Sequence, residues 1–233
     1  MKVSIMQPAY LPWLGYFDRV MRSDLHIVLD HVPIDRSSKT RFTNRNKIRT
    51  PQGSSWLTIP LRATHRSAKE PIKKIMINNE HNWQDKHLKS IKGSYMKSPY
   101  FDKYYSLLQP IYNSKWKDLS PLLKKSTEIL YNALGICTPF ISSSEIEPIQ
   151  TKAELIIELC KSVGATEYIS GPFGRDYLDP SRFEDEKIKL TFHDYCHPVY
   201  KQVFDGFEPY MSIVDLLFNH DANSCQILKQ PCA

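Results

Sequence analysis

The sequence lacks any apolar run close to the roughly 18 residues that a membrane-spanning helix requires. We therefore expect no membrane insertion. The apolar stretch at the N-terminus is also too short for a signal peptide, because Gln7 and Pro8 end it directly after Met6. The mean hydropathy of −0.43 and the hydrophobic fraction of 41% predict a soluble globular protein.

Glycine is scarce, with 8 in 233 residues, and the chain contains neither a GxGxxG fingerprint nor a P-loop. We therefore expect no glycine-rich turn that cradles phosphate. The five cysteines are widely spaced and form no CxxC pair, which excludes a zinc ribbon or a thioredoxin-type site. We expect most of them to be small core residues in a reducing cytoplasm. No HxH or HExxH spacing occurs, so no metal site is predicted.

Acidic residues are few in the first half of the chain. Residues 1–125 contain 23 Lys and Arg against 9 Asp and Glu, whereas residues 126–233 contain 8 against 16. The resulting net charges are +14 and −8. This asymmetry indicates either an anionic partner for the N-terminal half or a basic surface that only keeps the protein in solution.

The hydrophobic pattern predicts an α/β fold. Expected strands cover residues 2–6, 24–29, 56–61, 73–77, 168–170 and 188–192, and expected helices end near Met21, Tyr131, Gly164 and Asn219. Residues 36–49 form a polar, basic segment to which no strand is assigned. The pattern suggests a Rossmann-like three-layer sheet in one domain of 233 residues, with a mostly helical insertion around residues 83–134.

Two segments of the N-terminal half contain candidate binding residues. Residues 7–13 follow the first expected strand, where α/β sheets bind ligands, and Tyr10 and Trp13 offer flat faces for a base or a sugar. The alternative is a rigid aromatic turn that only packs. Residues 41–49 contain four cations, and arginine forks bind phosphate oxygens in pairs. The alternative is a solvated basic loop.

Three further segments carry histidine or glycine beside charged residues. Lys86 and His87 lie on an expected helix, and His87 shares a face with Trp83, which makes a core histidine as plausible as a catalytic base. Residues 170–178 follow a strand and contain two glycines and Arg175, and a plain turn is the alternative. Asp194 and His197 follow the last expected strand and are candidates for an acid/base pair.

Seven stretches in order along the chain resemble the WbqC-like family. They are residues 6–17, 44–48, 56–60, 86–87, 170–172, 197–200 and 216–219. The most specific is the first, Met-Gln-Pro-Ala-Tyr-Leu-Pro-Trp-Leu-Gly-Tyr-Phe. Many relatives carry His before this Gln, whereas this chain has Met6, so a base at that position is absent here.

The resemblance implies an enzyme of O-antigen or other surface-polysaccharide biosynthesis, in lipopolysaccharide for example. The implied reaction transfers an aminoacyl group, glycyl in the family proposal, to the amine of a dTDP- or UDP-linked 4-amino-deoxysugar. An activated acyl donor is then needed, either glycyl-tRNA or ATP plus glycine, and no tightly bound cofactor is expected. The catalytic candidates are His197, His87 and Asp194. The substrate-binding candidates are Gln7, Tyr10, Trp13, Asn44, Arg45, Asn46, Lys47, Lys86, Ser170, Gly171, Arg175, Tyr200, Gln202 and Asn219.

Two alternatives stay open at this point. One is a CoA-dependent or other acyl transferase acting on the same class of sugar. The other is a non-catalytic protein that binds RNA or a larger complex, which the basic N-terminal half also fits.

Overall fold

The strand expected at residues 2–6 forms the middle of a five-stranded parallel sheet. The computed structural model describes residues 1–34, 42–62 and 70–230. The strand order is β5-β2-β1-β6-β7, with β1 at Lys2–Met6, β2 at Leu25–Val28, β5 at Phe140–Ser142, β6 at Glu167–Ser170 and β7 at Lys189–Phe192. Every pairing in this sheet is parallel, as βαβ crossovers require.

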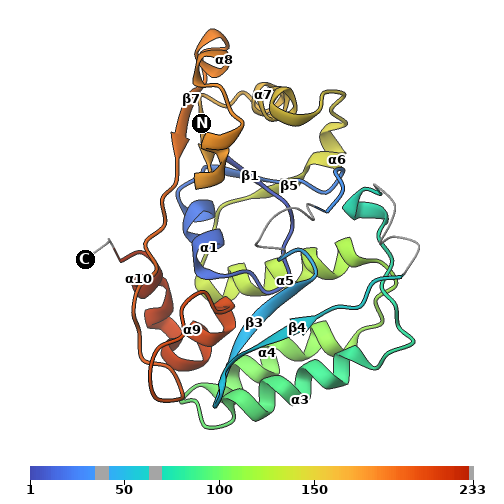
Figure 1. Ribbon diagram of the computed structural model, residues 1–233, viewed down its shortest axis with the longest axis vertical. Helices are drawn as coiled ribbons and strands as arrows, with labels where there is room; N and C mark the ends of the chain where they lie inside the picture. The colour runs from blue at the N-terminus through green and yellow to red at the C-terminus, as the bar shows by residue number, and fades with distance from the viewer. Residues whose placement is uncertain (35–41, 63–69, 231–233) are drawn as a thin grey trace.

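Helices cover both faces of this sheet, which makes three layers (Figure 1). Along β1, Val3 and Ile5 face a core cluster that includes α7 (Lys152–Ser162) and α8 (Pro180–Asp185). Met6 belongs to the opposite cluster, with α1 (Leu14–Met21) and α9 (Ile213–His220). The strand therefore alternates between two cores, and the predicted Rossmann-like α/β class is confirmed.

The chain between β2 and β5 adds a second lobe. A β-hairpin of β3 (Arg45–Thr50) and β4 (Gly53–Thr58) comes first. In the described part of the chain that follows, the long helices are α3 (Trp83–Tyr95), α4 (Phe101–Asn113) and α5 (Leu119–Leu134). Figure 1 shows the hairpin beside α3 and α4, below the parallel sheet. The helical face predicted for α3 is confirmed, because Trp83, His87, Ile91 and Tyr95 are all buried.

Shorter elements complete the chain. They are the 3-10 turns η1 (Ile72–Lys74), η2 (Pro172–Asp176) and η3 (Asp221–Asn223), and the short helices α6 (Ser143–Ile146) and α10 (Ser224–Leu228). Within the described ranges, no helix combines the length and the apolar character needed to cross a bilayer.

Two local predictions are wrong. Residues 73–77 form no strand, because the amides of Ile72 and Lys73 donate to the carbonyls of Val32 and Asp30 and begin the turn η1. Residues 45–50, to which no strand is assigned from the sequence, are β3. The alternation of β3 is hidden in the sequence because one of its inward positions is Asn46, whose side chain donates to the Leu11 carbonyl at 2.6 Å.

Gly15 in α1 is predicted to resist substitution. A Cβ at this position would lie 2.3 Å from Cη2 of Trp13, so Gly15→Ala must displace the indole. We expect it to lower the free energy of unfolding by about 1–3 kcal/mol in urea titrations. Gly93 in α3 has no atom within 4 Å of such a Cβ, so Gly93→Ala should raise stability by about 0.5–1 kcal/mol. Equal effects of the two substitutions would contradict the packing seen at Trp13.

Candidate active site

The carboxyl ends of β1 and β6 mark the point where the strand order of the sheet reverses. From β1 the chain continues to β2 and β5 on one side, whereas β6 and β7 lie on the other. Open α/β sheets bind their ligands outside the carboxyl ends of the strands at such a point, because the loops diverge there. Gln7 follows β1, Gly171 follows β6 and His193 follows β7.

A buried carboxylate from α1 meets His193 at this edge. Asp18 Oδ2 accepts from His193 Nε2 at 2.5 Å and from Arg22 Nε at 2.7 Å. Asp18 is 2% exposed and the His193 side chain 8%. The backbone amide of His193 also donates to the Ser170 carbonyl, which fixes the ring at the end of the sheet. The second ring nitrogen, Nδ1, has no hydrogen-bond partner among the residues that the structure describes, and it is not among the fully buried unpaired atoms.

Two opposing effects act on the Asp18 carboxyl. Burial raises its pKa, but the hydrogen bonds from His193 and Arg22 outweigh burial and hold the pKa below its usual value. Asp18 therefore stays ionised at neutral pH. The carboxylate accepts a hydrogen bond from Nε2–H of His193. This leaves Nδ1 with its lone pair available to accept a proton, as in orienting carboxylate–histidine pairs generally.

His87, one of the predicted catalytic candidates, lies in the core. Its Nδ1 contacts the Tyr10 hydroxyl at 3.0 Å, and the Tyr10 hydroxyl lies 2.5 Å from that of Tyr112. The Trp83 ring packs against it at 5.3 Å. Burial lowers the pKa of His87 to about 4, although a hydrogen bond to the Thr58 backbone acts in the opposite direction. The core alternative considered for His87 fits this arrangement.

His197, the other predicted base, has both ring nitrogens engaged by the backbone. Nδ1 donates to the Pro198 carbonyl at 2.9 Å, and Nε2 accepts from the Tyr210 amide at 3.1 Å. Burial also lowers the pKa of His197. The predicted Asp194–His197 pair is not formed, because the exposed Asp194 carboxylate binds both Nη atoms of Arg175 at 2.7 and 2.6 Å.

Three predicted substrate-binding residues contact a different acidic residue, Asp215, two through its carboxylate and one through its backbone. Its oxygens accept from Tyr200 and Gln202, both at 2.9 Å, and from Tyr95 at 3.0 Å. Asn219 donates to the backbone carbonyl of Asp215 at 2.7 Å. Tyr200 and Gln202 are buried, so their hydrogen bonds stabilise the fold and their side chains are not accessible to a ligand in this structure.

Some residues of the predicted basic segment are bonded inside the fold and others are partly exposed, and Arg41 lies outside the described residues. Asn44 and Asn46 donate to backbone carbonyls within the fold. Arg49 is buried and donates to three carbonyls, those of Thr50, Gly53 and Asp205.

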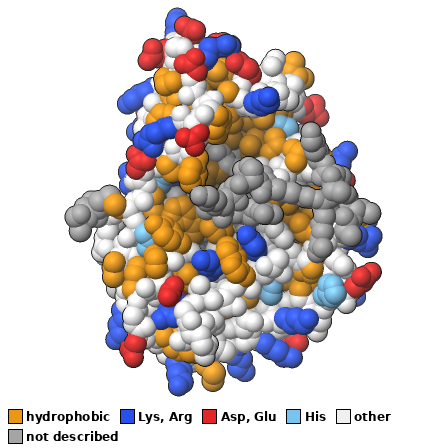
Figure 2. Space-filling model, in the orientation of Figure 1, with side chains coloured by type: hydrophobic (Ala, Val, Ile, Leu, Met, Phe, Trp, Pro, Cys, Tyr) orange, Lys and Arg blue, Asp and Glu red, His pale blue; other side chains and the backbone are white. Residues whose placement is uncertain are grey.

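Arg45 and Lys47 instead flank an exposed aromatic ring. The Arg45 guanidinium carbon lies 4.3 Å and the Lys47 ammonium nitrogen 5.3 Å from the ring centroid of Trp56, which is 40% exposed. We call Arg45, Lys47 and Trp56 the hairpin surface. Figure 2 shows Lys and Arg side chains beside hydrophobic ones over the hairpin.

The predicted residues near β1 differ in access. Tyr10 is fully buried and has no free face for a ligand. Gln7 is partly buried and donates to the Pro33 carbonyl at 2.9 Å. Trp13 is partly exposed, and its ring meets the edges of Tyr195 at 5.5 Å and Tyr210 at 6.0 Å. Since Tyr195 also lies 5.9 Å from the His193 ring, an aromatic wall runs from Trp13 to the Asp18–His193 pair.

The remaining predicted residues lie apart from one another. Ser170 is buried at the end of β6, and Gly171 follows it beside α1. Arg175 forms the exposed pair with Asp194. Lys86 is exposed on α3, in the second lobe.

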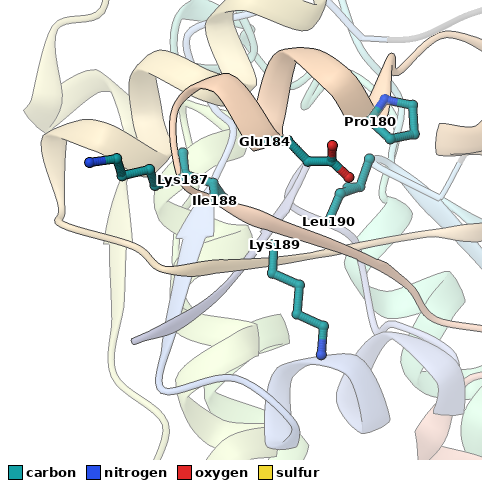
Figure 3. A pocket seen from close by; sticks show the side chains of 6 residues that line it. All are labelled: Pro180, Glu184, Lys187, Ile188, Lys189 and Leu190. Carbon is teal, nitrogen blue, oxygen red and sulfur yellow. The ribbon is translucent and has the colours of Figure 1, made fainter.

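Two surface cavities lie away from the carboxyl edge. One, of about 360 Å³, lies beside β7 and α8 (Figure 3). It is lined by Pro180, Glu184, Lys187, Ile188, Lys189 and Leu190. The side chains of Lys187 and Lys189 point in different directions, so they do not converge on one anion. The other, of about 400 Å³, lies next to the start of α3 and Trp116. Among the described residues, no three His, Cys, Asp or Glu side chains form a metal-binding group.

Asp18 and His193 are not among the site residues predicted from the sequence. Asp18 has a signal, since it is the one acidic residue in the otherwise apolar and basic α1. His193 is the first residue after β7, the usual place for a ligand-binding side chain in a parallel sheet. Their pairing has no sequence signal, because 175 residues separate them.

We predict that acid destabilises the protein through His87. The unfolded chain takes up a proton near pH 6.5, whereas the buried ring does so only near pH 4. The stabilising contribution is therefore complete above pH 6.5 and is lost as the pH falls towards 4. Lowering the pH from 7 to 5 should remove about 2 kcal/mol. In urea titrations at both pH values, the free energy of unfolding of His87→Gln should fall by about 2 kcal/mol less than that of the unaltered protein. An equal fall in both proteins would contradict the buried neutral state of His87.

Comparison with known proteins assigns the chain to a family. The model of the WbqC-like protein family matches residues 7–227. The chain is 35% identical to uncharacterized protein Rv1507c of Mycobacterium tuberculosis over 230 residues, which cover 98% of this chain and 97% of the relative. No solved structure matches the chain. This protein, with its Asp18–His193 pair at the carboxyl edge of a parallel sheet, therefore belongs to the WbqC-like family.

Proposed function

We propose that this protein is a transferase that attaches a glycyl group to the amine of a nucleotide-linked amino sugar, with His193 as its general base. The observation that carries the proposal is the Asp18–His193 pair at the carboxyl edge of the sheet, one strand away from the strand-order reversal. Membership of the WbqC-like family supports it, because the resemblance noted above implies this reaction.

The proposed reaction forms one amide bond. The neutral sugar amine attacks the carbonyl carbon of an activated glycyl ester, so that a C–N bond forms and the C–O bond to the carrier breaks. The attacking nitrogen must lose a proton, and the leaving oxygen must gain one. A single histidine beside both atoms can accept the first proton and deliver the second, which is the usual role of a positioned imidazole.

The surroundings of His193 suit this role better than those of the other two histidines. Its Nε2 is held by the Asp18 carboxylate, which would stabilise the imidazolium that forms when Nδ1 accepts a proton. His87 and His197 use their Nδ1 and Nε2 atoms for contacts inside the fold. The wall of Trp13 and Tyr195 beside His193 offers an amphipathic surface to a sugar or a base.

Activity of purified variants tests the base. With a dTDP-linked 4-amino-deoxysugar and glycyl-tRNA, or glycine plus ATP, the product gains the mass of one glycyl residue. His193→Gln and Asp18→Asn should each lower the transfer rate by about 10²–10⁴-fold, because they remove the proton acceptor or its orienting charge. Mass spectrometry of the sugar nucleotide measures both rates, and circular dichroism verifies that each variant is folded.

Asp194→Asn is the matched control. This carboxylate is one residue from His193 but exposed and paired with Arg175, so its loss should change the rate by less than about twofold. Full activity of His193→Gln would overturn the assignment of the base. Failure of every donor and sugar to give product with the unaltered protein would overturn the reaction.

A second function, RNA binding, is favoured by the hairpin surface. An exposed indole beside two cations is a stacking platform of the kind that binds single-stranded nucleotides, with the cations contributing to phosphate contacts. The basic N-terminal half of the chain is compatible with such a partner.

Fluorescence anisotropy with labelled tRNA tests this second function. Trp56→Ala should weaken binding by about tenfold, because one stacked base is lost. Tyr100, which is similarly exposed at 37%, serves as the control position, and Tyr100→Ala should bind as tightly as the unaltered protein. Binding that is absent, or insensitive to Trp56→Ala, would remove the hairpin surface as an RNA site.

A further inference from the structure

Arg19 is a cation without a counter-charge at the strand-order reversal of the sheet. It lies in α1 and reaches the segment that follows β6, where its guanidinium approaches Gly171. The side chain is partly exposed, and its Nε is buried without a hydrogen-bond partner. Among the residues that the structure describes, no carboxylate forms an ion pair with it. The groups that face it are the rings of Tyr16, Tyr168 and Tyr177 and, from β2, the buried His26.

The neighbouring carboxylate does not neutralise this charge. Asp18 directs Oδ2 towards His193 and Arg22, and no hydrogen bond or ion pair joins it to Arg19 among the described residues. His26 is itself uncharged, because burial, assisted by the Arg19 charge, lowers the pKa of its imidazole to about 3. An arginine does not lose its proton in a protein, so the charge persists although burial lowers the pKa of the guanidinium. A partly buried and unpaired charge is unfavourable, and an anion from outside the chain would compensate for it.

The Arg19 guanidinium lies close to the backbone of Gly171. A Cβ at Gly171 would lie 2.7 Å from Nη1 and 3.4 Å from Cζ of Arg19. The backbone at this position, with φ −73° and ψ 168°, is one that any residue adopts. A side chain here would therefore displace the Arg19 guanidinium, whereas the turn itself does not require glycine.

The same edge of the sheet carries the proposed base. Gly171 directly follows Ser170, whose carbonyl accepts the His193 amide at 2.8 Å. Gly171, which the Arg19 guanidinium approaches, and His193 therefore follow the neighbouring strands β6 and β7, and adjacent strands are about 5 Å apart. An anionic group on Arg19 would place the rest of its molecule within reach of His193.

We infer that the Arg19 guanidinium, seated against Gly171, is the binding site for the pyrophosphate of a nucleoside diphosphate. The planar fork of arginine binds two oxygens of one phosphoryl group, and the partly exposed position admits a ligand from solvent. The identification of the ligand as a sugar nucleotide rests on the proposed function, whereas the anion site itself rests only on the unpaired charge.

Isothermal titration calorimetry with inorganic pyrophosphate tests the site in the unaltered chain. We expect saturable binding, and dTDP should compete with it. Arg19→Gln should raise the Kd by about tenfold or more, because a charge-assisted hydrogen bond is lost. Gly171→Ala keeps the charge but displaces the guanidinium, so it should also weaken binding. Arg182→Gln should bind normally, since Arg182 is an exposed arginine already paired with Glu154.

Thermal unfolding separates a binding role from a structural one. If Arg19 binds an anion, pyrophosphate raises the Tm of the unaltered protein and not that of Arg19→Gln, and the variant is at least as stable without ligand. Equal pyrophosphate binding by the unaltered, Arg19→Gln and Gly171→Ala proteins would overturn the inference. A lower Tm in Arg19→Gln, together with no effect of pyrophosphate on the Tm of any protein, would also overturn it. Competition by glycine in place of dTDP would assign the anion as a carboxylate and overturn the pyrophosphate assignment. Pyrophosphate binding remains measurable if no glycyl transfer is found, so the two proposals fail independently.

Discussion

The buried carboxylate of Asp215 is the constraint on which the second lobe and the C-terminal segment depend. It receives hydroxyl groups from Tyr95 of α3 and Tyr200 of the C-terminal segment, and an amide from Gln202. The Tyr95 hydroxyl in turn accepts the backbone amide of Arg49 in β3. Burial raises the pKa of Asp215, and the three donated hydrogen bonds oppose the rise. Because such a group is tolerated only while its donors stay in place, β3 and α3 are held against the C-terminal part of the chain that contains Tyr200, Gln202 and Asp215.

The histidines show how the same residue type serves different purposes in one fold. His26 and His87 are buried, neutral members of hydrogen-bonded cores, and His197 joins two backbone groups of an irregular segment. His193 alone of these four is bound by an ionised carboxylate and retains a ring nitrogen without a partner among the described residues. Each of the four lies near aromatic or apolar residues in the sequence, so the difference between them arises from the contacts that they make in the fold.

The fold was more predictable than the site, for physical reasons. The strands β1, β2, β6 and β7 bury apolar side chains in short runs, so their composition alone indicates them. The strand β3 was missed because Asn46 replaces an apolar residue at an inward position. Tyr200 and Gln202 were predicted to bind substrate, whereas in the structure they are buried and donate to Asp215. The sequence does not separate these two roles, because both use the same polar residue types. Asp18 and Arg19 were missed because the residues they contact, His193 after β7 and Gly171 after β6, lie about 175 and about 150 residues later.

The central position of β1 has a consequence for how the chain folds. β1 pairs on one side with β2, 22 residues away, and on the other with β6, 165 residues away. During synthesis, the first strand therefore remains an exposed edge until nearly three quarters of the protein has been made. Such long-range parallel pairing forms slowly, and an open edge invites pairing with other chains. The second lobe, whose hairpin and three helices are close in sequence, can fold before the sheet is complete, so the parallel sheet is expected to close last.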